Sequence, residues 1–329
     1  MERRPSEKSI AVGRDPCFGH VNTTDAVAAF GHEMNREMMA LLRSLPVATH
    51  AEAVSLLMQH FRTPFFPEFD YFRNYFPPSW SILYWLGRMD TDRGVLSAED
   101  GQHSKTAHAM ALFLHPLDDH LKDGQLPAAH LPVLLRSQAW LRMNAALRRL
   151  AAGVDGGAEI VTDYINAYYA SIGCPPDVET LDGYCRHFRK QMATGMIVPA
   201  LLAAKLNQGR VFREELTAAY GAFGIAWRLM DDLQDMEVDF MAGNQSAIYF
   251  CLPAEIRQAW HARSQSDDAV RFEKLQSAVH QTGVWAALEE RICLELVSAA
   301  SKLDAIQMTG LAEEYRDLAR PFTDRSQGS

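Results

Sequence analysis

The sequence lacks the patterns of several common enzyme classes. No stretch alternates apolar and polar residues as a half-buried strand requires, so a sheet-based fold is excluded. It contains no phosphate-binding loop, no GxGxxG after a strand, no GxSxG and no HExxH. The common nucleotide-binding, serine-hydrolase and zinc-protease sites are therefore excluded as well. We expect an all-α protein.

Paired cysteines, long apolar runs and an excess of positive charge are also missing. The five cysteines form an odd set without the CxxC or Cys/His spacing of a metal site, which favours a reducing, cytoplasmic compartment. Residues 1–16 lack the apolar core of a secretory signal, and the best apolar run, near residues 107–117, is too short to span a bilayer. The net charge of −9 argues against nucleic acid as the main partner.

The chain is instead a succession of helical patterns. Residues 1–22 are predicted to be a flexible N-terminal tail. No linker rich in proline, glycine or serine divides the rest, so residues 23–325 are expected to form a single helical domain.

One long helix is expected over residues 215–246, and the rest of the chain is organised around it. Its first half is apolar on almost every side, which is typical of a helix in the middle of a core. Its second half carries Asp231, Asp232, Asp235 and Asp239. Acids four residues apart share one face in steps of about 6 Å and repel each other. A buried helix tolerates them only beside a compensating cation.

A second helix, within residues 101–123, repeats this design. Its apolar run ends in Asp118, Asp119 and Asp123. Taken alone, these acids could also belong to a solvated helix end. Two such helices facing each other would make a clamp for Mg²⁺, which prefers oxygen ligands and is completed by substrate phosphates and water. The candidate metal ligands are Asp118, Asp119, Asp123, Asp231, Asp232, Asp235 and Asp239.

Basic and aromatic residues supply the other candidate contacts. Arg186, Arg189 and Lys190 lie on one face of a helix expected from about residue 177 to residue 207. They would contact a diphosphate held by the metals, or else form an ordinary exposed face. An allylic carbocation left after loss of the diphosphate needs a dry aromatic pocket. Phe113, Phe223 and Trp227 are candidates for this lining or plain core residues, residues 61–88 could be aromatic wall or core cover, and Arg316 is a further candidate substrate contact.

The aspartate segments resemble those of a known family. MDDLQD, followed by Asp239 and Gly243, resembles the second aspartate-rich motif of trans-isoprenyl diphosphate synthases and related class I terpene synthases, and LHPLDDHLKDG resembles their first motif. YCRHFRKQMATG resembles the family's Lys-Thr segment, with Lys190 at the lysine and Gln191 replacing the threonine. The resemblance covers roughly residues 100–325. It implies an isoprenoid-synthase-like helical bundle with a central cavity, two or three Mg²⁺ ions, an allylic isoprenyl diphosphate substrate and a homodimer.

The sequence also departs from the family pattern. The elongating enzymes carry a Gly-Gly-Lys-Arg segment before the first motif and an Arg-Arg pair after it, but this chain has FRNYFPPSW and GQLPAAHLP. Losing those cations should weaken binding of a second diphosphate substrate. The resemblance therefore favours a class I terpene synthase, a lyase that ionises one allylic diphosphate at Asp119 and Asp231 and then cyclises it or eliminates a proton. Arg186 or Arg189 would then resemble the diphosphate-sensing arginine of terpene cyclases.

Two alternatives stay open. The first is a short-chain isoprenyl diphosphate synthase, a transferase that elongates or condenses head to head with altered cation contacts. The second is a non-catalytic partner subunit of a prenyltransferase. The retained acid clusters argue against this second role, because a subunit relieved of catalysis need not keep buried carboxylates.

Overall fold

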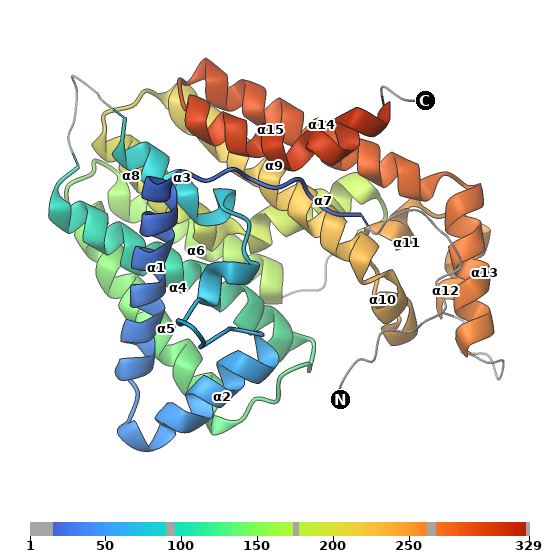
Figure 1. Cartoon of the computed structure of the whole chain (residues 1–329), viewed down its shortest axis with the longest axis horizontal. Coiled ribbons are helices and arrows are strands. Elements are labelled where there is room, and N and C mark those ends of the chain that lie inside the picture. Colours follow the sequence, from blue (N-terminus) through green and yellow to red (C-terminus); the bar gives the residue numbers. More distant parts are fainter. Residues whose placement is uncertain (1–15, 90–95, 174–177, 262–267, 327–329) are drawn as a thin grey trace.

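The computed structural model describes residues 16–89, 96–173, 178–261 and 268–326. Over this part of the chain every regular element is a helix, which confirms the all-α prediction (Figure 1). Two short 3-10 helices are η1 (Val47–Thr49) and η2 (Tyr71–Asn74). The α-helices are α1 (Asp25–Arg43), α2 (His50–His60), α3 (Pro78–Gly87), α4 (Ala98–Lys122), α5 (His130–Ala151), α6 (Gly157–Gly173), α7 (Leu181–Gln191), α8 (Ala193–Lys205), α9 (Arg210–Gln234), α10 (Met236–Ala242), α11 (Ala247–Cys251), α12 (Ala254–His261), α13 (Asp268–Gln281), α14 (Val284–Ala305) and α15 (Thr309–Ser326).

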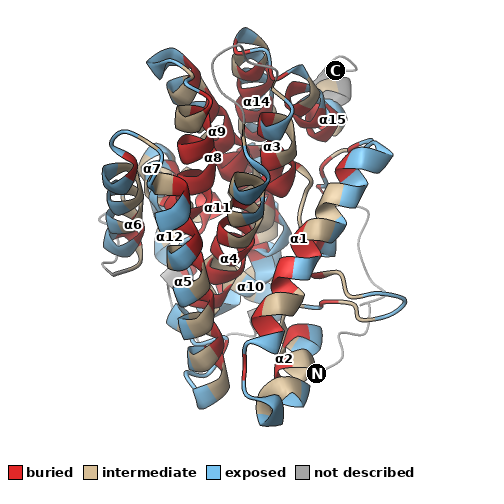
Figure 2. Cartoon of the chain, turned by 90° about the vertical axis from the view of Figure 1, so that its left-hand side faces the viewer, coloured by how far each residue is buried: buried red, intermediate tan, exposed pale blue. Residues whose placement is uncertain are grey.

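Helix α9 lies in the middle of the molecule. It packs against α14, which in turn packs against α15, and it also contacts α8 and α7 (Figure 1). Neighbours on several sides explain why its apolar residues are not confined to one stripe: Leu216, Phe223 and Leu229 are all buried. Each such side chain stabilises the fold by about 1.5–3 kcal/mol through removal from water. Figure 2 shows that buried residues are concentrated on α8 and α9, whereas outer helices such as α5 and α6 carry many exposed residues.

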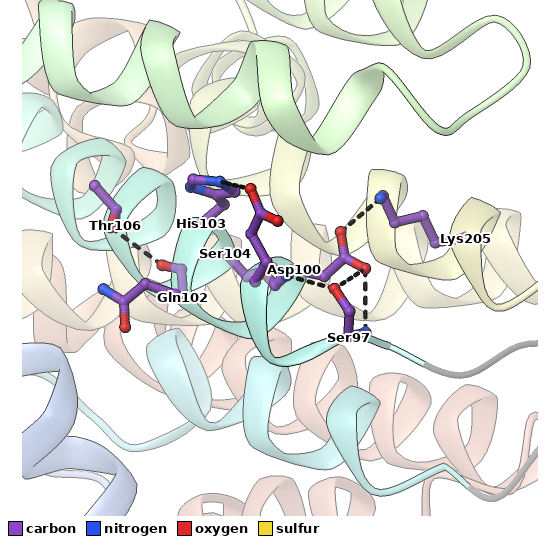
Figure 3. Close-up of polar contacts among 8 residues, drawn as sticks. Ser97, Asp100, Gln102, His103, Ser104, Thr106 and Lys205 are labelled. Carbon is purple, nitrogen blue, oxygen red and sulfur yellow. Dashed lines mark hydrogen bonds and ion pairs between the residues drawn. The ribbon is translucent and has the colours of Figure 1, made fainter.

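Helix α4 is the second long buried element, and its start is fixed by a capping box. The Ser97 hydroxyl accepts the Asp100 N–H at 3.0 Å, while the Asp100 carboxylate accepts the Ser97 N–H at 3.1 Å (Figure 3). Asp100 also pairs with Lys205 of α8 at 2.5 Å. Burial raises the Asp100 pKa, but the Lys205 ammonium and the Ser97 hydrogen bonds outweigh it, so the pKa is lowered. The cap therefore ties the first turn of α4 to α8.

Removing this cap should destabilise the protein measurably. Ser97→Ala deletes one partner of the first-turn N–H groups, which costs about 1 kcal/mol. Chemical denaturation monitored by circular dichroism would show the change. Ser137→Ala is the control, because the exposed Ser137 hydroxyl donates only to the Val133 carbonyl of its own helix. Equal midpoints for the two variants would contradict the capping role.

The structure corrects the extent of two predicted helices. The helix expected over residues 215–246 ends at Gln234, and α10 follows after Asp235. Hydrogen bonds four residues apart continue across this break, since Asp235 N donates to Asp231 O at 2.8 Å and Asp239 N to Asp235 O at 2.9 Å. The acids therefore keep their shared side. α10 ends at Ala242, and the φ of 74° at the following Gly243 suits glycine.

The helix expected from residue 177 to residue 207 is likewise two helices. α7 ends at Gln191 and α8 begins at Ala193, with Met192 between them. Gly224 lies so close to the Met192 sulfur that a methyl group there would clash, so the break is packed tightly against α9. Sequence periodicity alone could not locate it, because Met192 is compatible with a helix.

Part of the predicted N-terminal tail is packed. Residues 16–22 run beside α15, with Phe18 and Val21 buried and Gly19 N donating to Leu318 O at 3.1 Å. Phe18 lies edge-on to Phe76 with the ring centroids 4.8 Å apart. The prediction of a flexible tail therefore differs from the structure over residues 16–22, and its first fifteen residues lie outside the described part. Within the described ranges no helix is long and apolar enough to cross a membrane.

Candidate functional site

Two adjoining cavities lie along α4 and α9, with α7 on the wall of the first and residues of α8 and of the segment before α3 on the wall of the second. One is polar, with a volume of about 490 Å³, and the other is largely apolar, with a volume of about 560 Å³. The residues common to both linings are His115, Pro116, His120, Trp227 and Asp231. The two spaces therefore meet at the ends of α4 and α9, where the aspartates are.

Two of the three aspartates of the first motif face the polar cavity. Asp119 and Asp123, at the end of α4, line it. Asp118 does not, because its buried carboxylate accepts hydrogen bonds from Arg136 of α5 at 2.6 Å and Tyr168 of α6 at 2.7 Å. Neighbouring residues on a helix point about 100° apart, which separates these roles. Asp118 therefore forms a structural ion pair with Arg136.

The second motif is divided in the same way. Asp231, Asp235 and Asp239 line the polar cavity. Asp232 is 1% exposed and lies outside the lining. Its Oδ2 accepts the Ala247 N–H at 2.7 Å, and its Oδ1 lies 3.0 Å from Nε of Arg228. Asp232 therefore anchors the start of α11 and the Arg228 guanidinium.

The cavity holds more negative charge than its surroundings neutralise. Burial raises the pKa of Asp231 to about 6, and the charges of Asp232, Asp235 and Asp119 add to the rise, against the opposing Arg228. Burial and the Asp232 charge raise the pKa of Asp239 to about 7. Asp119 and Asp231 line the same cavity from different helices, so the two motifs face each other across it.

These carboxylates fit a hard divalent cation, provided that the ligand supplies part of the coordination. Carboxylate oxygens are the donors that Mg²⁺ prefers, and Mg²⁺ usually takes only one or two of them from the protein. Among the described residues no three aspartate, glutamate, histidine or cysteine side chains converge on one metal position. Metals here would need phosphate oxygens and water as further ligands, as the sequence predicts.

The raised pKa values predict how pH affects the metal-free protein. An unfolded aspartate titrates near 3.9. Because folding raises the pKa of Asp239 to about 7, its contribution to stability is complete below about pH 4 and is lost as pH rises through 7. Asp239→Asn should therefore raise the melting temperature by several degrees at pH 8 and leave it nearly unchanged at pH 4, as measured by calorimetry in EDTA. A stabilisation of equal size at both pH values would argue against a buried, repelled carboxylate.

The predicted basic triad does not line the cavity. Tyr184, His187, Phe188 and Gln191 form the face of α7 that does. Arg186, Arg189 and Lys190 are exposed on its other faces, and Arg189 lies 3.7 Å from Glu295 of α14. Arg316 is further away, on α15, where it pairs with Asp304. The structure therefore does not bring these four cations to the aspartates.

Two cations that the sequence analysis did not single out do line the polar cavity. Arg228 belongs to α9 and Lys122 to the last turn of α4. Arg228 stands three residues before Asp231 and four before Asp232, the spacing of helical ion pairs, and this was a readable signal. It was missed because Arg228 sits within an otherwise apolar run.

Aromatic side chains and histidines surround the apolar cavity. Of the three predicted aromatics, Phe223 and Trp227 line it. Phe113 lies outside the lining and packs against Phe61 and Tyr71 with centroids 5.8 and 5.7 Å away. The region 61–88 supplies part of the wall, through Phe61, Arg62, Tyr71, Asn74, Tyr75, Phe76 and Ser79.

Three histidines lie near the junction of the two cavities. Burial lowers the pKa of His115, of His120 and of His60, so the neutral imidazole is favoured at pH 7. His60 and His120 share a hydrogen bond of 2.8 Å between Nε2 and Nδ1. Neutral histidines add no positive charge, so they do not neutralise the aspartates.

Comparison with known proteins gives matches only at the level of structure. No protein-family model matches the sequence, and no curated protein matches it significantly. A geranylgeranyl pyrophosphate synthase from Corynebacterium glutamicum has a TM-score of 0.67 at 13% identity, covering 91% of this chain and 92% of that one. A polyprenyl synthase from Caulobacter crescentus, complexed with calcium and isoprenyl diphosphate, has a TM-score of 0.65 at 14% identity over 91% and 98% of the chains.

A third structure extends this group. A decaprenyl diphosphate synthase from Rhodobacter capsulatus has a TM-score of 0.62 at 14% identity, over 92% of this chain and 99% of that one. Likeness over nearly the whole of both chains concerns the complete helical bundle and not a single motif. The chain has the all-α fold of the polyprenyl and geranylgeranyl diphosphate synthases, as its aspartate motifs indicated.

Proposed function

We propose that the protein is a divalent-metal-dependent enzyme that ionises an allylic isoprenyl diphosphate and transfers the resulting prenyl group to an acceptor. The observation that carries this proposal is the set of five aspartates, from α4, α9 and α10, around a cavity that opens into an apolar one: Asp119, Asp123, Asp231, Asp235 and Asp239. A diphosphate and a hydrocarbon chain are the two halves of one substrate, and each cavity suits one half.

The residues of the chain would share the work as follows. Asp119 and Asp123 on one side and Asp231, Asp235 and Asp239 on the other would hold two or three Mg²⁺ ions against the diphosphate. When bound, these ions act as Lewis acids that make the diphosphate a leaving group. The apolar cavity excludes water from the allylic cation, and the faces of Trp227 and Phe223 attract its positive charge.

Prenyl transfer is supported over cyclisation by the resemblance to prenyl diphosphate synthases of known structure. One observation favours the second candidate, a terpene synthase, in which the cation cyclises or loses a proton. The start of α3 carries PPS in place of basic residues, and Arg62 is the one lysine or arginine among the described residues that line the apolar cavity. A second diphosphate would therefore find little positive charge on that side.

Product analysis distinguishes the two. The purified protein would be incubated with Mg²⁺ and geranyl, farnesyl or geranylgeranyl diphosphate, each with and without isopentenyl diphosphate, and the products separated by chromatography and mass spectrometry. Longer diphosphates formed only with isopentenyl diphosphate support prenyl transfer. A hydrocarbon or alcohol formed from one substrate alone supports the terpene synthase.

If no product forms in any mixture, the enzymatic proposal fails. The non-catalytic partner subunit would then be the better account. The homodimer and the cytoplasmic location stay predictions, which size-exclusion chromatography with light scattering and fractionation of the source cells would check.

A further inference from the structure

The polar cavity needs positive charge from the protein as well as from metals. In the proposed function, on which this inference rests, a diphosphate brings its own negative charge into a space lined by five aspartates. Metal ions contact only some of its oxygens, and the others need hydrogen-bond donors if they are to be held out of water. The donors must lie on the cavity wall, where Arg186, Arg189 and Lys190 do not.

Arg228 is built into that wall. Its Nε donates to the Tyr184 hydroxyl at 2.6 Å and lies 3.0 Å from Oδ1 of Asp232. The guanidinium also lies over the rings of Phe188 and Tyr184, 5.6 and 5.9 Å from their centroids. One edge of the planar group is thus fixed by the protein, which leaves the other edge to bind a planar pair of phosphate oxygens.

The remaining contact of Arg228 is one that ligand binding would release. Nη1 lies 3.5 Å from Oδ2 of Asp231, a longer separation than the contacts of Nε. Asp231 is the cavity-lining acid of the pair, and Asp232 is the buried one. When Asp231 turns its oxygens to a cation, Nη1 loses this partner while Asp232 and Tyr184 keep Nε in place. Arg228 therefore balances the charge of Asp231 as long as no cation binds that carboxylate.

Two further donors line the same cavity. Ser246, at the N-terminus of the short helix α11, is 1% exposed, and its hydroxyl has no hydrogen-bond partner among the described residues. A buried hydroxyl without a partner is unfavourable, and a ligand that accepts a hydrogen bond from it removes that penalty. Lys122 is exposed, lines the cavity and forms no ion pair within the described part of the chain. It is free to extend toward a phosphate.

We propose that Arg228, Ser246 and Lys122 form the diphosphate cradle of this chain, in place of the basic triad on α7. Arg228 grips the diphosphate from the second-motif side, Ser246 donates its hydroxyl from the adjacent helix, and Lys122 contacts it from the first motif. The binding charge thus comes from the helices that carry the aspartates.

Binding of inorganic pyrophosphate in the presence of Mg²⁺, measured by titration calorimetry, tests the cradle without requiring turnover. Arg228→Gln and Lys122→Gln should each weaken binding by about tenfold or more, because each removes a charge-assisted hydrogen bond. Ser246→Ala should weaken it by about two- to tenfold. Lys274→Gln, on exposed α13, is the matched control for Lys122→Gln and should bind as the wild type does.

Further variants distinguish a loss of pyrophosphate binding from a failure to fold. If Arg228→Gln fails to fold because Asp232 is left unpaired, the double variant Arg228→Gln with Asp232→Asn removes that buried charge, and the Lys122 and Ser246 variants test the cradle independently. Unchanged pyrophosphate affinity in the cradle variants, together with a loss in Lys190→Gln or Arg189→Gln, would overturn the cradle and leave the proposed function standing. A wild-type protein that binds no pyrophosphate with Mg²⁺ would overturn both.

Discussion

Replacing Asp231 by asparagine is expected to reduce diphosphate release from an allylic substrate by about a thousandfold or more, and Asp119→Asn should do the same. Each carboxylate faces the polar cavity from a different helix, so each variant removes charge from one side of the metal clamp. A Lewis acid contributes several kcal/mol to stabilising the transition state, and about 1.4 kcal/mol corresponds to a tenfold rate. Release of pyrophosphate in a coupled assay measures the change.

The same variants carry an internal control for folding. Asp231 has a pKa of about 6 because it is buried near other acids, so its neutral replacement should not destabilise the metal-free protein at pH 8. Lost activity with an unchanged or raised melting temperature is the expected combination. Full turnover in both variants would remove the basis of the metal clamp.

Asp118→Ala is expected to lower stability by about 3 kcal/mol or more while the Mg²⁺ dependence of turnover is retained at low temperature. It leaves the Arg136 guanidinium and the buried Tyr168 hydroxyl without their shared acceptor. Breaking a buried ion pair by removing one partner typically costs about 3–5 kcal/mol. Thermal unfolding and the Mg²⁺ concentration for half-maximal rate would be measured together.

Asp163→Ala provides the comparison, because Asp163 is exposed on α6 and its removal should change stability by less than about 0.5 kcal/mol. These results would assign Asp118 a role in stability and Asp119 a role in metal binding. If Asp118→Ala melted like the wild type but required far more Mg²⁺, Asp118 would be a metal ligand after all, as its place in the motif suggested.

The aspartates and the helical fold were accessible from sequence because each has a local signature. An apolar run that ends in acids marks α4 and α9, and the absence of a two-residue alternation excludes a sheet. The direction of each carboxylate was not accessible. Asp118 and Asp119 are adjacent, and only the position of α5 and α6 decides which one meets Arg136 and Tyr168.

The direction of the basic residues relative to the cavity was likewise not accessible from the sequence. Periodicity correctly gathers Arg186, Arg189 and Lys190 away from the apolar face of α7, but it cannot say that the cavity lies on the face of Tyr184 and His187. The break at Met192 was also invisible, because it depends on close packing against Gly224 of α9. Tertiary contacts between distant segments fixed these features, and no short stretch of sequence contains them.

The polar and the apolar cavity are continuous, because both are lined by His115, Pro116, His120, Trp227 and Asp231. An amphiphilic molecule that enters therefore meets a polar environment at one end and an apolar environment at the other. A guest with an ionic head and an oily tail can settle in one orientation only. In the reverse orientation, its charged head would lie among Tyr75, Phe76 and Phe223, and its hydrocarbon tail would lie against the carboxylates. Both placements are strongly unfavourable. In the proposed function, solvation alone would therefore orient the reacting bond before any specific contact is made.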